Sequence, residues 1–203
     1  MLRTVFGVLV VVLFAGPAFA DYKPGLDAFR GGNYEFALKQ WLPLAEKGHA
    51  KAQNSVGFMH ARGLGVPTDH REAIKWYTKS AKQSFPLAAY NLGLIYTRGT
   101  GTLPNQEMAT GWFRKAAEVG HLKAQIVYSE RLRDGVGTEE DLSAAYAWLV
   151  VAADQAKGKE QTRIGSTLSR LVARMSGSEV SKAAGLAKRV KARVNEASAR
   201  VDR

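Results

Sequence analysis

The stretch Asp69-His-Arg-Glu-Ala-Ile-Lys-Trp-Tyr-Thr-Lys-Ser-Ala81 returns along the chain at a fixed interval of 36 residues. Its first residue has equivalents at Asn33, Asn105 and Asp141. Its alanines recur at the same interval, as Ala37, Ala73, Ala109 and Ala145 and as Ala45, Ala81, Ala117 and Ala153. A period of this length with helix-forming composition indicates a solenoid of stacked helical hairpins, an architecture that usually binds other proteins.

Two helices are predicted within each repeat. Asp69 is expected to cap one of them, over about 69–82, because its carboxylate can accept from the free amides of the first turn. Pro86 suits the first turn of the next helix, over about 86–97, and Gly99 is expected to end it. The small residue Gly93 marks a place where two helices approach closely, with aromatic residues such as Tyr77 filling the space beside it.

Four quoted strings carry a family resemblance: Ala88-Ala-Tyr-Asn-Leu-Gly-Leu-Ile-Tyr96, Gly63-Leu-Gly-Val-Pro-Thr-Asp69, Ala73-Ile-Lys-Trp-Tyr77 and Lys115-Ala-Ala-Glu-Val-Gly-His-Leu-Lys-Ala-Gln125. In register over residues 33–155, the chain resembles the Sel-one-like repeat family (SLR), relatives of the tetratricopeptide repeats. The resemblance implies an all-α fold, a right-handed superhelix of antiparallel helix pairs. Residues 24–47 would form a shortened opening pair. Residues 156–203 would form basic C-terminal capping helices, and 177–188 resembles the family's closing helix.

Departures from this pattern fall in the third repeat. Ser129 stands where Gly57 and Gly93 stand in the earlier repeats, and Arg131-Leu132 replaces the usual aromatic position. The third repeat is therefore expected to pack differently.

Residues 1–20 have the features of a cleaved secretory signal. Arg3 precedes an apolar run over residues 5–15, which is shorter than the ~20 residues of a membrane span, and Ala18-Phe-Ala20 is a small-x-small cleavage site. We expect an exported, periplasmic or secreted protein whose mature chain begins at Asp21; an uncleaved anchor is the alternative. Since the chain has no cysteine, neither lipidation at a cysteine nor a disulfide is expected.

The positive charge is concentrated at the C-terminal end. Residues 21–155 hold 16 Lys and Arg against 14 Asp and Glu, whereas residues 156–203 hold 12 against 4. A basic segment can seek nucleic acid, anionic membrane or an acidic partner. An exported protein rarely meets nucleic acid, so an anionic envelope surface or an acidic protein is the expected target.

No motif of catalytic or cofactor chemistry is recognisable. The Gly-x-Gly pairs at 63–65, 99–101 and 135–137 lack a preceding strand and a following Gly-Lys-Ser/Thr, so they are interpreted as helix-ending glycines rather than phosphate cradles. The four histidines (His49, His60, His70 and His121) lack zinc-ligand spacing, and the acidic residues at 139–141 suit a helix start. A non-enzymatic protein without cofactor, metal or small-molecule substrate is expected.

The resemblance to tetratricopeptide repeats implies that the first helix of each hairpin lines a concave face, and we expect the binding surface there. The residues expected to point into it are those outside the packing pattern: Lys51, Asn54, Phe58, Arg62, Leu87, Tyr90, Leu94, Arg98, Lys123, Ile126, Glu130 and Arg133. Such a mixture of aromatic, aliphatic and arginine residues is typical of interface hot spots. Two functions stay open: a periplasmic scaffold or regulator that binds a protein segment in this face, and an envelope protein bound to anionic lipid, lipopolysaccharide or wall polymer through its basic C-terminal helices.

Overall fold

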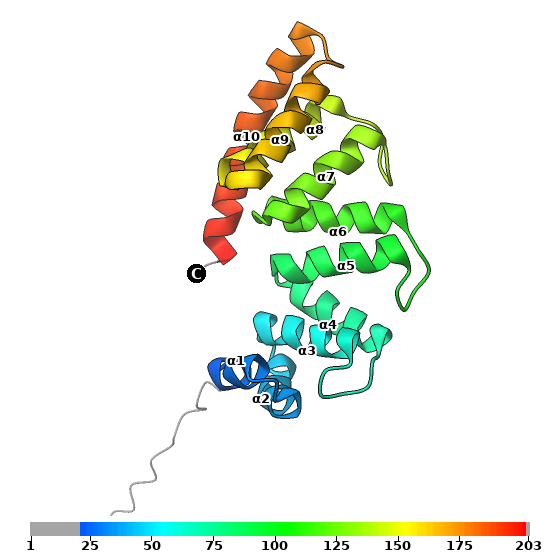
Figure 1. Cartoon of the computed structure of the whole chain (residues 1–203), viewed down its shortest axis with the longest axis vertical. Coiled ribbons are helices and arrows are strands. Elements are labelled where there is room, and N and C mark those ends of the chain that lie inside the picture. Colours follow the sequence, from blue (N-terminus) through cyan, green and yellow to red (C-terminus); the bar gives the residue numbers. More distant parts are fainter. Residues whose placement is uncertain (1–20, 202–203) are drawn as a thin grey trace, which may run out of the picture.

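The computed structural model describes residues 21–201, and this part of the chain contains ten α-helices and no β-strand. The proposed signal, residues 1–20, lies outside the described residues. Figure 1 shows the helices following one another from α1 at one end of the molecule to α8 near the other, as layers of a solenoid. The predicted all-α right-handed solenoid of helix hairpins is confirmed.

Each repeat is a pair of antiparallel helices of nearly constant length. The helices are α1 (Lys23–Arg30), α2 (Tyr34–Glu46), α3 (Ala50–Arg62), α4 (His70–Lys82), α5 (Pro86–Arg98), α6 (Gln106–Glu118), α7 (Leu122–Asp134), α8 (Leu142–Gln155), α9 (Gly158–Val172) and α10 (Gly177–Val201). The three complete repeats are α3–α4, α5–α6 and α7–α8, and each helix from α1 to α8 packs on the next one in the chain.

From α2 to α8, every helix except α5 begins with one of two kinds of side-chain cap, and α5 begins at Pro86 without one. Asp69 Oδ1 accepts from Glu72 N at 2.9 Å, and Asn33, Asn105 and Asp141 cap α2, α6 and α8 in the same way. At the starts of α3 and α7 the cap is a histidine ring: Nδ1 of His49 or His121 accepts from the amide three residues later. The recurring structural role predicted for these two histidines is confirmed, and each must be neutral at Nδ1 to accept.

Close approach of successive layers depends on small residues set against large rings. A Cβ added to Gly93 would lie 2.5 Å from the Phe113 ring, and one added to Gly57 would lie 3.0 Å from the Tyr77 ring. Phe113 and Tyr77 are 1% and 2% exposed, so neither ring has room to move aside. The predicted close approach at Gly93 is confirmed, but the ring beside it is Phe113, and Tyr77, which was expected there, lies against Gly57.

The glycine pairs after α3, α5 and α7 do more than end a helix. Gly63, Gly99 and Gly135 have φ of 66°, 74° and 64°, which is the expected left-handed cap. The second glycine of each pair also lies against the preceding hairpin: a Cβ at Gly137 would be closer than 3 Å to the backbone of Gln106 and Glu107. These loops therefore fix the spacing of the layers.

The last two helices, α9 and α10, do not continue the stacking of hairpins. Both pack on α8, and α10 returns along α8 far enough to reach α6. Near the end of α10, Ser198 and Val194 lie beside Gly120 in the turn between α6 and α7. Ala183, Ala187, Val190 and Val194 form the buried side of α10. The apolar face of α10 is thus used against the solenoid.

Candidate binding groove

A groove runs along the surface formed by α1, α3 and α5. It consists of two adjoining cavities of about 290 and 210 Å³, which share Phe58 of α3 and Asn91 of α5. The larger cavity is lined by Tyr22, Leu26, Phe29, Trp41, Asn54, Ser55, Phe58, Leu87 and Asn91. The smaller is lined by Phe58, Ala61, Arg62, His70, Tyr77, Asn91, Leu94, Ile95, Arg98 and Thr100. Because two lining residues are common to both cavities, they form one continuous site.

The larger cavity is an aromatic pocket built around the N-terminal segment. The Tyr22 ring stacks on Trp41 with centroids 5.0 Å apart, and its hydroxyl is 2.8 Å from Ser55 Oγ. Phe29 packs against Trp41 and, edge-on, against Phe58. The Trp41 indole N–H donates to the Tyr22 carbonyl at 3.0 Å, which ties α2 to the chain just before α1. Burial raises the pKa of the Tyr22 hydroxyl, so it stays protonated near neutral pH.

Two amides form the polar middle of the groove. Asn91 Nδ2 donates to Asn54 Oδ1 across 3.4 Å, a long hydrogen bond between α5 and α3. Asn54 is only 7% exposed, yet it lines the larger cavity. A side-chain amide carries two donors and one acceptor oxygen. The pair therefore has donors and acceptors left over for a bound molecule.

The smaller cavity is bordered by cations. Arg62 and Arg98 are both exposed, and within residues 21–201 neither guanidinium has a carboxylate within the 4.0 Å of an ion pair. Arg62 lies over the Phe58 ring at 5.8 Å, which holds its alkyl chain along the groove wall. At the far end of the groove, Lys51 lies over the Tyr22 ring at 4.5 Å. The groove therefore has an aromatic pocket, an amide pair in its middle and cations at its margins.

The structure brings six of the predicted residues together at this groove: Asn54, Phe58, Arg62, Leu87, Leu94 and Arg98. Lys51 lies at its edge through its contact with Tyr22. Tyr90 lines neither cavity: its ring stacks on His121 at 4.7 Å and packs on Phe113, and burial raises its pKa. Tyr90 therefore packs against α6 and the start of α7 and does not line the groove.

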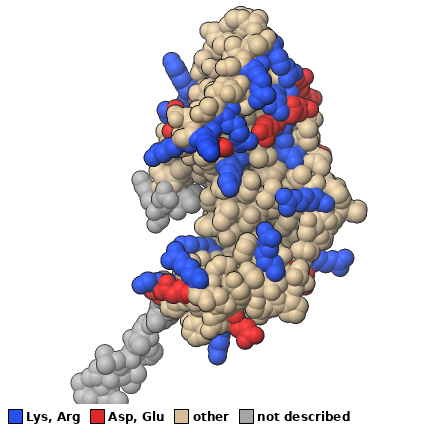
Figure 2. All heavy atoms as spheres, viewed as in Figure 1, with Lys and Arg blue, Asp and Glu red and all other residues tan. Residues whose placement is uncertain are grey.

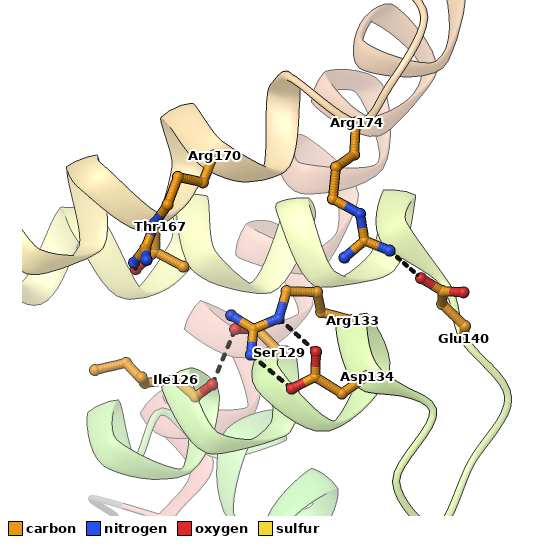
Figure 3. A network of polar contacts seen from close by, with 8 residues as sticks. All are labelled: Ile126, Ser129, Arg133, Asp134, Glu140, Thr167, Arg170 and Arg174. Atoms are coloured by element: carbon orange, nitrogen blue, oxygen red, sulfur yellow. Dashed lines mark hydrogen bonds and ion pairs between the residues drawn. The ribbon is translucent and has the colours of Figure 1, made fainter.

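In the third repeat the prediction is partly wrong. Ile126 is 4% exposed and belongs to the hydrophobic core, because α7 is covered there by neighbouring helices. Arg133 is not the repeat equivalent of Arg98, because the residue 36 positions after Arg98 is Asp134. Figure 3 shows Arg133 forming two hydrogen bonds to Asp134, of 2.7 and 2.6 Å, so this cation is already paired. Glu130, half-buried, and Lys123, exposed, complete a polar surface instead of an apolar groove.

The expected difference in packing of the third repeat comes mainly from Arg131. Its side chain is 8% exposed and crosses the interface between repeats. The guanidinium donates to Thr97 Oγ1 at 2.7 Å, Thr110 Oγ1 at 3.1 Å and Gln106 Oε1 at 3.1 Å, and lies over the Phe113 ring at 5.0 Å. All of these partners are neutral. The buried positive charge is thus stabilised by neutral hydroxyl and amide oxygens of the preceding repeat and not by a carboxylate.

Sequence reasoning did not find the N-terminal wall of the groove or its centre. Tyr22, Leu26 and Phe29 come from the segment before the periodic pattern, and Asn91 was not among the residues assigned to the concave face. One available signal was variation at equivalent positions: Ser55, Asn91 and Val127 differ, whereas the packing alanines do not.

Metal and membrane-spanning features are absent from the part of the chain that the structure describes. No group of three or more His, Asp or Glu side chains in residues 21–201 is placed to hold a metal ion. No helix in that range is both long enough and apolar enough to cross a membrane.

A second charged feature lies on α10, far from the groove along the chain. Lys182, Arg189, Arg193 and Arg200 are separated by 7, 4 and 7 positions, so at about 100° per residue they fall within roughly 40° on one side of the helix. All four are exposed, and none is in an ion pair with any carboxylate of residues 21–201. We call these four residues the α10 cation row. On the face shown in Figure 2, Lys and Arg gather over the upper part of the molecule, where α9 and α10 lie.

Comparison with known protein families gives a match over half of the chain. The family model of the Sel1 repeat matches residues 50–85, 86–121 and 122–157, which correspond to the pairs α3–α4, α5–α6 and α7–α8. Chitin synthase regulatory factor 3 of Schizosaccharomyces pombe is 44% identical over 62 residues, which is 30% of this chain and 7% of that protein. The exopolysaccharide production negative regulator of Rhizobium leguminosarum bv. viciae is 38% identical over 69 residues, covering 34% of this chain and 26% of the regulator.

Solved structures with the same fold extend the match. A Sel1 repeat protein from Oxalobacter formigenes superposes with a TM-score of 0.68 at 32% identity, over 73% of this chain and 59% of the other. A protective antigen of uropathogenic Escherichia coli strains with an SLR fold has a TM-score of 0.50 at 23% identity, over 88% of this chain and 48% of the other. At that identity the second likeness concerns the fold alone. The chain spans only part of the length of all these relatives.

Proposed function

Because the chain belongs to the Sel1 repeat family, whose members are generally interaction scaffolds or regulators, we propose that it is a non-enzymatic scaffold that binds a segment of a protein partner in the groove of α1, α3 and α5. The observation that carries the proposal is the groove itself: an aromatic pocket continues into a cavity bordered by two arginines that form no ion pair with any carboxylate of residues 21–201. The few residues that supply most of the binding energy in protein interfaces are enriched in Trp, Tyr and Arg.

Two of the relatives are named as regulators, of chitin synthase and of exopolysaccharide production. Both names fit a protein that acts by contacting other proteins, which supports the scaffold reading. The signal-like sequence of residues 1–20 supports export, and we propose that binding takes place in the periplasm or outside the cell.

Photo-crosslinking at defined positions tests the groove. A photoreactive residue replaces Leu87, which is 41% exposed at the rim of the larger cavity, and in a separate variant it replaces Lys39 on α2, which is exposed and lines neither cavity. We expect a partner that is captured from position 87 and not from position 39. Phe58→Ala should then lower the affinity for that partner by roughly 1–2 kcal/mol or more in calorimetry. Equal capture from both positions would contradict the proposal.

The α10 cation row favours a second candidate function, attachment to an anionic envelope surface. No large apolar side chain is exposed within the described part of α9 and α10, so the attraction would be electrostatic rather than insertive. Replacing Lys182, Arg189, Arg193 and Arg200 by Gln should abolish sedimentation with vesicles rich in anionic lipid. Binding of the unaltered protein should fall sharply between low and physiological salt, where charges are screened beyond about 8 Å. Binding that persists in the Gln variant would dismiss this candidate.

A further inference from the structure

We infer that the partner segment is an extended peptide that carries a bulky apolar side chain and an acidic side chain three to five positions apart. This inference rests on the proposed function, and it names the chemistry that the groove selects. The chemical environments follow one another along α3 and α5 in an order that fits such a peptide.

The apolar side chain fits the cavity nearest α1. Tyr22, Leu26, Phe29 and Phe58 surround it, and Leu87 stands partly exposed at its rim. A cavity of about 290 Å³ takes one large side chain with space around it. An aromatic or large aliphatic residue removes the most apolar surface from water there.

The acidic side chain fits the other end of the groove. Arg62 and Arg98 occupy equivalent positions 36 residues apart, in the last turns of α3 and α5, and both border the smaller cavity. Two guanidiniums at one cavity, without an acidic partner in the described chain, are complementary to a carboxylate that can bind them bidentately. The apolar lining of the groove does not continue into the next repeat, because Glu130 occupies the position equivalent to Leu94 there.

The middle of the groove indicates an extended backbone. The Asn54–Asn91 pair has unused amide donors and acceptors where the two cavities meet, since Asn54 lines the larger cavity and Asn91 lines both. A helical ligand uses its own backbone groups internally, whereas an extended segment presents them to the groove.

The spacing follows from helix geometry. Asn54 and Arg62 are eight residues apart on α3, and Leu87 and Arg98 are eleven apart on α5. At about 1.5 Å per residue these separations are roughly 12 and 16 Å. An extended chain covers about 3.3–3.6 Å per residue, so the two side chains of the ligand lie roughly three to five positions apart.

Selection from a library of random twelve-residue peptides displayed on phage tests the inference, with the purified protein as bait. We expect selected peptides to share one aromatic or large aliphatic residue and one Asp or Glu at that spacing, in either chain direction. The double variant R62Q/R98Q should lose the preference for the acidic residue and keep the apolar one. Phe58→Ala should lose the apolar preference. A Lys39→Gln/Lys82→Gln double variant removes two exposed cations outside both cavities and should select the same peptides as the unaltered protein.

Individual peptides then separate the charge effect from any effect on folding. For a selected peptide, R62Q/R98Q should weaken binding at least tenfold in fluorescence anisotropy. For the same peptide with its acidic residue replaced by Asn or Gln, the double variant should change binding less than twofold. Circular dichroism and thermal melting of every variant confirm that the fold is kept.

The outcomes distinguish the two proposals. Peptides whose selection depends on Phe58 but that show no acidic residue, or no fixed spacing, would overturn this inference and leave the groove as the binding site. Selected peptides that bind the groove variants and the unaltered protein equally would overturn both. Failure to select any peptide above background would overturn the inference, while the crosslinking at position 87 would still decide the proposed function.

Discussion

The second and third repeats have the same backbone arrangement, but their exposed surfaces differ in chemical character. On α5, Leu94 and Arg98 line an open cavity. On α7, the equivalent residues are Glu130 and Asp134, and Asp134 is paired with Arg133. The residues that stack the layers barely change between the two repeats, since Ala88 and Ala124 are both 0% exposed. In this protein the packing positions maintain the solenoid, and the positions between them decide where a ligand can bind.

The largest effect on stability is expected from a substitution at one of the packing positions. Replacing Gly93 by Leu places a side chain where even a Cβ would lie 2.5 Å from the Phe113 ring. Overpacking of this kind costs on the order of 1–3 kcal/mol or more, measured as a loss in the free energy of unfolding by urea.

Gly111 provides the matched control, because it is also a helical glycine but has no atom within 4 Å of an added Cβ. Gly111→Leu should leave stability within about 0.5 kcal/mol or raise it slightly. If both substitutions have the same effect, close approach at Gly93 is not what fixes the distance between α5 and α6.

A loss of similar or somewhat smaller size is expected at the junction between the two repeats. Arg131→Ala removes three hydrogen bonds from a buried guanidinium to Thr97, Thr110 and Gln106. Hydrogen bonds that involve a charged group contribute about 1.5–3 kcal/mol, and the acceptors left behind lose their partner. We expect a loss of that order in thermal and urea unfolding.

Arg133→Ala is the comparison for this variant, since Arg133 forms a partly exposed ion pair with Asp134 on the same helix. Such pairs contribute about 0–1 kcal/mol. Equal losses for Arg131→Ala and Arg133→Ala would mean that the buried arginine does not hold the third repeat in place.

The smallest effect concerns pH and the histidine cap of α7. Burial, together with the nearby Lys123, lowers the pKa of His121 below its ordinary value of 6.5. The unfolded chain therefore binds this proton more readily than the folded protein does, so stability is fully present above about pH 6.5 and declines as the pH falls through the lower folded-state pKa.

Urea unfolding at pH 7.5 and pH 5 measures this decline. His121→Asn keeps a capping oxygen and removes the titrating ring, so the variant should show a weaker dependence on pH. The same replacement at His49, the exposed cap of α3, is the control for loss of a histidine ring. A pH dependence unchanged in His121→Asn would show that other groups cause it.

Much of the fold could be predicted because its causes are local and repeated. A single Asp or Asn before each second helix, a glycine after each first helix and a 36-residue period place most helix ends to within a residue or two. The helix that begins at Pro86 was expected over about 86–97 and runs to Arg98. The role of the second loop glycines was missed, because their close contacts are with a hairpin some 30 residues earlier.

The candidate site was predicted less completely. Phe58, Arg62 and Arg98 were found because they are the residues of a repeat that packing does not use. Ile126 was misplaced because helical periodicity cannot say which partly apolar face a neighbouring helix will cover.

The sequence by itself determined the period, the caps and the alternation of small and large packing residues, since each depends on contacts within one repeat or between adjacent ones. The tertiary structure alone decided that Tyr22 and Phe29 meet Phe58 and Asn91 in one groove, and that Arg131 is buried. A groove is the space left between side chains of helices that are far apart in the chain, so its shape depends on how those helices stack. No single repeat contains that information.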